Sequence, residues 1–212
     1  MFTIRPYRAE DAAACGDCLY DGFFSCPIDD HDRAMLVDYA QVLIEKCNFT
    51  YVAETEDREV VGFICGKYDK KFSSVLASRY ETQKHYGKWC AMFVKFYLKL
   101  YHLSPAFQKQ FDAFYKQLRE RDAKTFGACD LELVALTSRV DYRQGLGTAL
   151  VETFLQRAAH DRAVTIRLWT NSLASWEFYE KRGFVKIAEK PFGDGSGERS
   201  LVYAYEIHGG TQ

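Results

Sequence analysis

The spacing of apolar residues predicts a strand and two helices at the start of the chain, followed by a hairpin. A polar turn at 56–58 separates two runs that are rich in Val, Ile, Phe and Tyr, which indicates paired strands. Gly62 and Gly66 in the second run predict bends or a close backbone approach. Asp30 or Asp32 can cap the second helix. The expected elements are strands at 2–5, 48–54 and 59–67, and helices at 10–19 and from 30 or 32 to 47.

The stretch 68–127 differs from its surroundings because its pattern is helical and aromatic. It contains 14 of the 33 aromatic residues of the chain. Ser104 and Pro105 predict the N-cap and the first position of a helix. Two sets of mostly aromatic residues, spaced three to four positions apart, form stripes that predict two amphipathic helices. The stripes are Trp89, Phe93, Phe96, Tyr97 and Leu100, and then Phe107, Phe111, Phe114, Tyr115 and Leu118.

After residue 127 the chain returns to alternating strands and helices. No internal repeat, low-complexity tract or Pro/Gly-rich linker divides the sequence. We therefore expect one domain over 1–212 of the α/β (α+β) class, with 68–127 as a helical, aromatic-rich insertion. The expected elements are strands at 129–137, 164–170, 184–189 and 201–207, helices at 147–160 and 173–182, and a loop at 191–199.

The composition is that of an ordinary globular protein. Of 212 residues, 48% are hydrophobic and 27% are charged, and the formal net charge is -1. A near-zero charge gives no broad electrostatic footprint for nucleic acid. No apolar run approaches the ~20 residues that cross a membrane, and the N-terminus has no signal-peptide pattern. We expect a cytoplasmic protein with no nucleic-acid or membrane partner.

Seven cysteines are scattered through the expected helices and strands. Their odd number fits reduced, mostly buried thiols better than a disulfide framework. Cys15 and Cys18, with Cys26 and His31 nearby, could suggest a metal. A structural zinc site needs four ligands, and no second pair follows at a suitable spacing. A helix with cysteines at i and i+3 is the simpler hypothesis, so no metal is expected.

A strand followed by a Gly-x-Gly turn and an amphipathic helix is the first motif with chemical content. The turn runs Tyr142-Arg143-Gln144-Gly145-Leu146-Gly147-Thr148. In such a turn, backbone N–H groups and a helix N-terminus point to one place, which favours the binding of a phosphate group. Arg143 adds a positive charge there. A tight connection without a ligand is the alternative. No Gly-Lys-Ser/Thr follows, so a P-loop is not supported.

A second motif, Asn171-Ser172 followed by Phe178-Tyr179-Glu180-Lys181-Arg182-Gly183-Phe184, lies one strand later. Together the two motifs make residues 130–190 resemble the GNAT superfamily of acyl-CoA-dependent N-acyltransferases. Tyr142 stands where that family has a leading Arg or Gln. The resemblance implies a mixed, strongly bent central sheet with helices on both faces. It places the helical insertion between the third and fourth strands.

The resemblance also implies an acyl donor, acetyl-CoA or a related acyl-CoA. Its pyrophosphate would lie on the amides of residues 144–148, and its pantetheine arm beside the preceding strand, where two strands splay. A bulge in that strand would free a backbone N–H for the thioester carbonyl. The implied contacts are Leu136, Thr137, Arg143, Gln144, Gly145, Leu146, Gly147 and Thr148, with either Asn171 or Ser172.

Two residues are expected to carry the chemistry. Tyr179 would be the general acid, because a phenol of pKa ≈ 10 is protonated at neutral pH and can donate to the departing thiolate. The alternative is an aromatic packed on the helix face with its hydroxyl satisfied locally. Glu132 would be the base that removes a proton from the amine. A strand Glu that faces solvent or pairs with a Lys is the alternative, and Asp130 is a weaker substitute.

The acceptor is expected to be a primary amine, on either a small molecule or a peptide. The insertion is either extra core, with a homodimer surface, or an acceptor lid in which Tyr80, Tyr86 and Trp89 contact the acceptor. The sequence is also compatible with two other classes of function. They are a non-catalytic acyl-CoA-binding regulatory module and a protein-interaction domain that uses the aromatic insertion.

Overall fold

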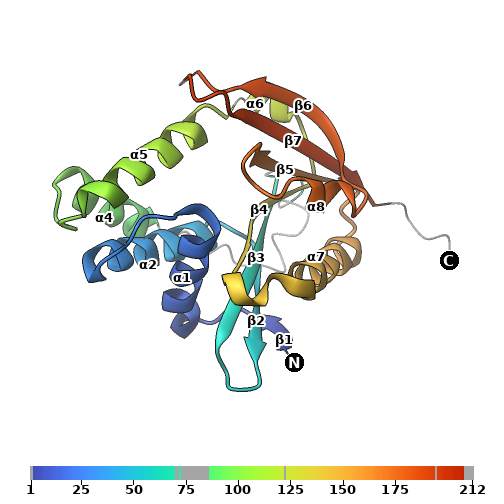
Figure 1. Ribbon diagram of the computed structural model, residues 1–212. Coiled ribbons are helices and arrows are strands. Elements are labelled where there is room, and N and C mark those ends of the chain that lie inside the picture. Colours follow the sequence, from blue (N-terminus) through green and yellow to red (C-terminus); the bar gives the residue numbers. More distant parts are fainter. Residues whose placement is uncertain (1, 70–71, 73–85, 122, 194, 208–212) are drawn as a thin grey trace.

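The computed structural model describes residues 2–69, 72, 86–121, 123–193 and 195–207. They form a seven-stranded sheet in the order β1-β2-β3-β4-β5-β7-β6 (Figure 1). The β4–β5 pair is parallel and the other neighbours are antiparallel, so the sheet is mixed, as expected. The strands are β1 Phe2–Pro6, β2 Phe49–Thr55, β3 Val60–Tyr68, β4 Leu131–Ser138, β5 Thr165–Asn171, β6 Val185–Pro191 and β7 Arg199–Glu206.

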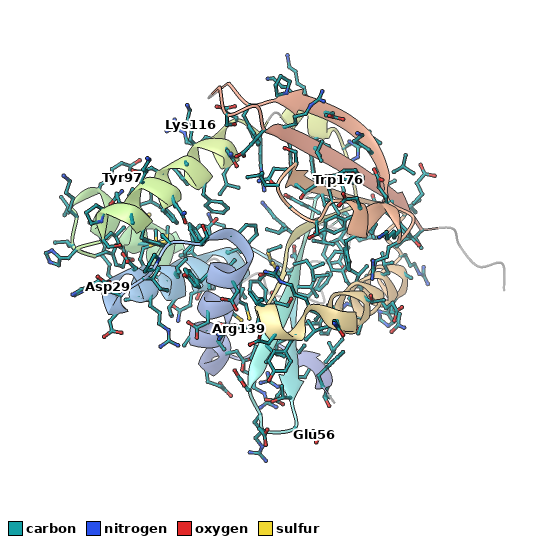
Figure 2. All side chains as sticks on the ribbon, viewed as in Figure 1. Asp29, Glu56, Tyr97, Lys116, Arg139 and Trp176 are labelled. Atoms are coloured by element: carbon teal, nitrogen blue, oxygen red, sulfur yellow. The ribbon has the colours of Figure 1, made fainter. Side chains whose placement is uncertain are left out.

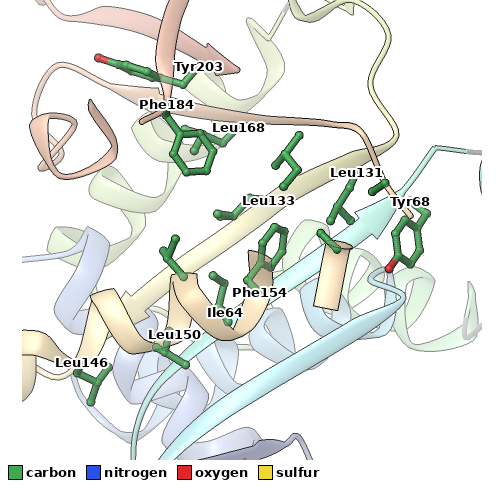
Figure 3. Close-up of a cluster of buried hydrophobic side chains, with 14 of the residues drawn as sticks. Ile64, Tyr68, Leu131, Leu133, Leu146, Leu150, Phe154, Leu168, Phe184 and Tyr203 are labelled. Carbon is green, nitrogen blue, oxygen red and sulfur yellow. The ribbon is translucent and has the colours of Figure 1, made fainter. Parts of the chain in front are cut away.

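Helices cover both faces of the sheet. One face packs on α7 through Leu150 and Phe154, which are fully buried (Figure 3). The other face packs on α1 and α2 around Phe63 and Cys65. Burial of each such Leu or Phe side chain contributes about 1.5–3 kcal/mol. The helices are α1 Ala12–Phe23, α2 Asp30–Glu45, α4 Tyr86–Tyr97, α5 Pro105–Arg119, α6 Ala123–Phe126, α7 Arg143–His160 and α8 Glu177–Glu180, with 3-10 turns η1 Ala9–Asp11 and η2 Val140–Tyr142.

β4 contains a β-bulge. Cys65 of β3 pairs with Ala135 and Gly66 pairs with Leu133, so Val134 is an extra residue in β4. Before the bulge, Leu133 packs in the cluster on the α7 side, whereas Ala135 after it packs in the cluster with α1 and α2. The buried residues of β4 therefore face α7 before the bulge and α1 and α2 after it. The regular alternation of the sequence does not reveal this change of face.

The glycines of β3 mark a close approach, as expected, but mainly of side chains. A Cβ on Gly62 would lie 2.6 Å from Leu146, and one on Gly66 would lie 2.6 Å from the Phe49 ring and 2.7 Å from that of Phe154. Because neither glycine has a side chain, α7 can lie directly on β3.

Two local expectations were wrong. Asp29, and not Asp30 or Asp32, caps α2, because its extended backbone lets its carboxylate accept from the Asp32 amide at 2.9 Å. The helix expected at 173–182 contracts to the four residues of α8. Asn171 accepts bonds from the amides of Leu173 and Ala174, and this Asx turn delays the helix.

The helices between β3 and β4 build a core of their own with α2. Phe107 and Phe111 of α5 are buried against Met35 and Leu36. The insertion therefore contributes core, which was one of the two expectations for it. Tyr80 lies outside the described residues, and so do the side chains of Tyr86 and Trp89. None of the described helices is long and apolar enough to cross a membrane.

Hydrogen bonds to the Asp32 carboxylate connect this insertion to α2. The fully buried carboxylate accepts from the Ser104 amide at 2.9 Å and from its hydroxyl at 2.6 Å. We expect Asp32→Ala to lower the free energy of unfolding by about 1–3 kcal/mol, because both Ser104 donors lose their partner. Urea unfolding measures this loss. Asp30→Ala, an exposed change in the same helical turn, is the control, and equal losses in the two variants would contradict the assignment.

Candidate functional site

The sheet opens into a wedge between β4 and β5. In these two fully described strands, pairing is restricted to Leu131–Leu133 with Ile166–Leu168, whereas β5 follows β7 as far as Asn171. The β4 bulge at Val134 lies directly after the last pair. Backbone groups of β4 that face the wedge thus lose their strand partner, and they are available to a ligand.

The start of α7 lies beside this wedge. Gly145 has a φ of 80°, a left-handed conformation that separates η2 from the regular helix beginning at Leu146. The first amides of that helix have no intrahelical acceptor, so this N-terminus favours an anion. A Cβ on Gly147 would lie 3.2 Å from the Phe178 ring, which shows how closely α8 covers the turn. Figure 3 shows Leu146 and Leu150 anchoring this helix to the sheet.

Arg182 is a cation at this helix N-terminus that the sequence analysis missed. Its guanidinium lies 3.5 Å from the centroid of the Phe178 ring and donates to the Thr148 hydroxyl. Its Nε is buried and forms no hydrogen bond with any described residue. Its two terminal nitrogens donate to the Thr148 hydroxyl and to the Phe178 carbonyl, the latter at 2.8 Å, so Arg182 holds α8 against the start of α7. Its positive charge at this helix N-terminus suits a phosphate group. Its position beside Gly183, inside the second motif, was the available signal.

Several expected ligand contacts already have partners in the fold. Arg143 donates to the Asp21 carbonyl at 2.7 Å. Arg139, which is labelled in Figure 2, donates to the Asp21 carboxylate at 2.7 Å. The Thr137 hydroxyl donates to the Cys18 carbonyl at 2.6 Å. Leu136 packs against the core on the α7 side. The backbones of these residues, more than their side chains, are therefore free to meet a ligand.

Asn171 and Ser172, the alternatives for one polar contact, are also engaged. The side-chain oxygen of Asn171 accepts from the amides of Leu173 and Ala174, and its side-chain nitrogen donates to the Gln117 side chain of α5 at 3.4 Å. Ser172 Oγ accepts from the Arg199 amide at 2.9 Å. Both side chains hold the end of β5 in place, and neither is distinguished from the other as a ligand contact.

Tyr179 extends from α8 into the core on the α7 side of the sheet. Its half-buried ring packs against Phe178, Phe184 and Tyr203, with centroids 5.4, 5.7 and 6.3 Å away. The hydroxyl forms no hydrogen bond within the described part of the chain, so the alternative of a locally satisfied hydroxyl finds no support. Burial raises the pKa of Tyr179 to about 12, which keeps the phenol protonated.

Glu132 lies on the opposite face from Tyr179, just before the bulge. Burial raises the pKa of its carboxyl, and the charges of Arg121 and Lys67 oppose that rise. Lys67 of β3 and Arg167 of β5 are its neighbours across the strands, but no ion pair within 4 Å joins Glu132 to a described residue. Asp130 is less suited to act as a base, because its carboxylate accepts from the amides of Val164 at 2.7 Å and Thr165 at 2.9 Å.

The cysteines of the first helix contribute to packing. Cys15 and Cys18 are fully buried between α1 and the sheet. Burial raises the pKa of Cys18 to about 12, which disfavours the thiolate that binds metals. In the described ranges no group of three or more His, Cys, Asp and Glu side chains gathers as a metal site.

The fold and these features define an acetyltransferase of the GNAT type. The model of the acetyltransferase (GNAT) family matches residues 17–184, and the chain belongs to this family. The family match spans the α1–β4 region as well as both sequence motifs. No curated protein matches the sequence significantly.

Solved structures share the fold at low sequence identity. The ribosomal-protein-S18-alanine N-acetyltransferase from Escherichia coli is 14% identical with a TM-score of 0.58, over 100% of this chain and 97% of that one. Aminoglycoside 6'-acetyltransferase type Ii is 16% identical with a TM-score of 0.55, over 96% of each chain. A chain of the NatC complex bound to Gag peptide and CoA is 14% identical with a TM-score of 0.52, over 98% and 99%.

Proposed function

We propose that the protein is an N-acetyltransferase that moves an acetyl group from acetyl-CoA directly to a primary amine. The observation that carries this proposal is the turn with a left-handed Gly145 at the start of α7, which lies beside the β4–β5 wedge and beside the positive charge of Arg182. A similar fold binds CoA in the NatC complex. All seven cysteines are free thiols, which fits the reducing cytoplasm that we propose as its location.

The phosphates of the donor would bind to the amides of residues 144–148, with Arg182 as an additional cation. The pantetheine arm would lie in the wedge beside Leu136 and Thr137. A backbone N–H at the Val134 bulge would then donate to the thioester carbonyl. This donor stabilises the negative charge that develops on the carbonyl oxygen as the amine attacks.

The two candidate catalytic groups would act from opposite faces of the sheet. Glu132 accepts a proton from the ammonium form of the acceptor, and the free amine attacks the thioester carbon. The C–N bond forms, the C–S bond breaks, and the Tyr179 hydroxyl donates its proton to the thiolate. The second proton of the amine then replaces the one that Tyr179 gave up. The products are an amide, CoA thiol and one proton released to solvent.

Gly145→Ala tests the phosphate turn. Its added Cβ meets nothing within 4 Å, so the substitution strains only the backbone at φ 80°. We expect about tenfold weaker acetyl-CoA binding in calorimetry, which corresponds to ~1.4 kcal/mol. Gly195→Ala is a matched control with φ 75° and equally open space in the β6–β7 loop. Native affinity in Gly145→Ala, or an equal loss in Gly195→Ala, would refute the assignment.

The proposal is tested by measuring CoA thiol release from acetyl-CoA with a panel of amines. Release that depends on an amine supports the transferase. Calorimetric binding of acetyl-CoA without release for any amine would instead indicate the non-catalytic binding module. A protein that does not bind acetyl-CoA would contradict both, and would favour an interaction domain.

A further inference from the structure

A cation that forms no ion pair with any described residue lies on the Glu132 side of the sheet. Arg121 follows α5, and its guanidinium lies over the ring of Trp169 at 5.7 Å from the centroid. Trp169 is stacked on Phe126 of α6 at 5.3 Å with an interplanar angle of 6°. We call Arg121, Phe126, Glu132 and Trp169 the Arg121 cluster; it joins the insertion to β4 and β5.

No acidic side chain among the described residues forms an ion pair with Arg121, although the charge of Glu132 acts on it. The side chain is half-buried, and no hydrogen bond or ion pair within 4 Å joins it to any residue in the described ranges. Burial lowers the pKa of its guanidinium, and the charge of Glu132 acts in the opposite direction. A desolvated cation of this kind is costly until an anion binds to it.

The insertion restricts the room beside this cluster. Gln110 of α5 accepts from the Ser25 amide at 3.1 Å, in the segment between α1 and α2. Near the other end, Gln117 donates to Glu198 at 2.7 Å, and Glu120 accepts from the Gly193 amide at 2.9 Å. Figure 1 shows α5 passing from α4 towards the β6–β7 turn. A helix held at both ends over this face favours a small acceptor over a long peptide.

We infer that the acceptor is a small amine that also carries a carboxylate, such as an amino acid. Arg121 would bind the carboxylate, and Glu132 would bind the ammonium group and remove its proton. This inference rests on the proposed function, and it names the substrate class of the same site. Opposite charges on the two side chains match opposite charges on a zwitterion, and the guanidinium fork suits a carboxylate.

The test compares amino acids with the amines that remain when their carboxylate is removed, for example phenylalanine with phenethylamine. Thiol release gives kcat/KM for each member of a pair. We expect the native protein to prefer the amino acid by about tenfold to a hundredfold, the contribution of one charge-assisted contact. Arg121→Gln should reduce the ratio of the two kcat/KM values to about one, and Arg121→Lys should retain part of the preference.

The ratio within a pair isolates carboxylate recognition, since any change in the basicity of Glu132 affects both members alike. Arg119→Gln removes the same charge from an exposed site two residues away, and it should keep the native ratio. A native preference for the plain amine, or an unchanged ratio in Arg121→Gln, would overturn the inference.

Ligand binding separates this inference from the proposed function. Saturation-transfer NMR with phenylalanine and phenethylamine needs no turnover. Amino-acid binding that Arg121→Gln abolishes, without thiol release for any amine, would support the carboxylate site and refute the transferase. Thiol release with amines that lack a carboxylate, and no response to amino acids, would support the transferase and refute the carboxylate site.

Discussion

Glu132→Gln is expected to lower kcat/KM for acetyl transfer by about 10²- to 10⁴-fold, the usual contribution of a general base. The amide has nearly the same shape as the carboxylate but cannot accept a proton from the ammonium group. Because Glu132 makes no ion pair with a described residue, the substitution should leave stability and acetyl-CoA affinity nearly unchanged. Glu177→Gln, an exposed change of the same charge on α8, is the control.

The pH–rate profile makes this prediction specific. The pKa of Glu132 is raised by burial, against the opposing charges of Arg121 and Lys67. A base must be ionised, so activity should fall as the pH drops through a pKa above that of an exposed glutamate. The acidic limb should therefore lie at a higher pH than for an exposed carboxylate, and Glu132→Gln should lose it. A variant that keeps the limb would remove Glu132 from the mechanism.

Tyr179→Phe is expected to lower kcat by about 10²-fold or more, with little change in the affinity for acetyl-CoA. The ring packing against Phe178 and Phe184 remains, and the hydroxyl has no partner in the described structure whose loss would destabilise the fold. With a pKa of about 12 the phenol stays protonated across the working range, so Tyr179 adds no alkaline limb near neutral pH.

Tyr205→Phe gives the matched control, because Tyr205 packs on Phe184 at 5.0 Å and also has a hydroxyl to lose. We expect its steady-state turnover to stay near that of the native protein. An unchanged turnover number in Tyr179→Phe would reject the role of general acid. Equal losses in the two variants would indicate a general effect of removing a hydroxyl from this group of rings, and not a specific role of the Tyr179 proton.

Much of the scaffold could be predicted because local patterns and tertiary packing agree. The strands, the N-cap at Ser104 and the Gly-x-Gly turn all follow from residue types whose preferences the fold preserves. The length of the helix after β5 was overestimated, because the side chain of Asn171 binds a backbone amide of the segment that was expected to start this helix. Such competition depends on one rotamer, which periodicity does not report.

The site was less predictable, because its geometry depends on contacts between distant segments. The position of the β4 bulge follows from the pairing of Cys65 and Gly66 with β4. These paired residues lie some 70 positions apart in the sequence. Arg121 belongs to no motif, and its importance arises only where the end of α5 meets Trp169 and Glu132. Arg182 lies inside a recognised motif, but only the structure shows its buried, unpartnered Nε.

Direct acetyl transfer is best tested by following the acetyl group itself. Acetyl-CoA labelled in its acetyl group is incubated with the protein and a panel of amino acids and amines, and mass spectrometry follows both the amines and the intact protein. Direct transfer predicts N-acetylated amine and free CoA in equal amounts, with no labelled acetyl group on the protein. A labelled protein intermediate, or CoA release without an acetylated amine, would contradict direct transfer.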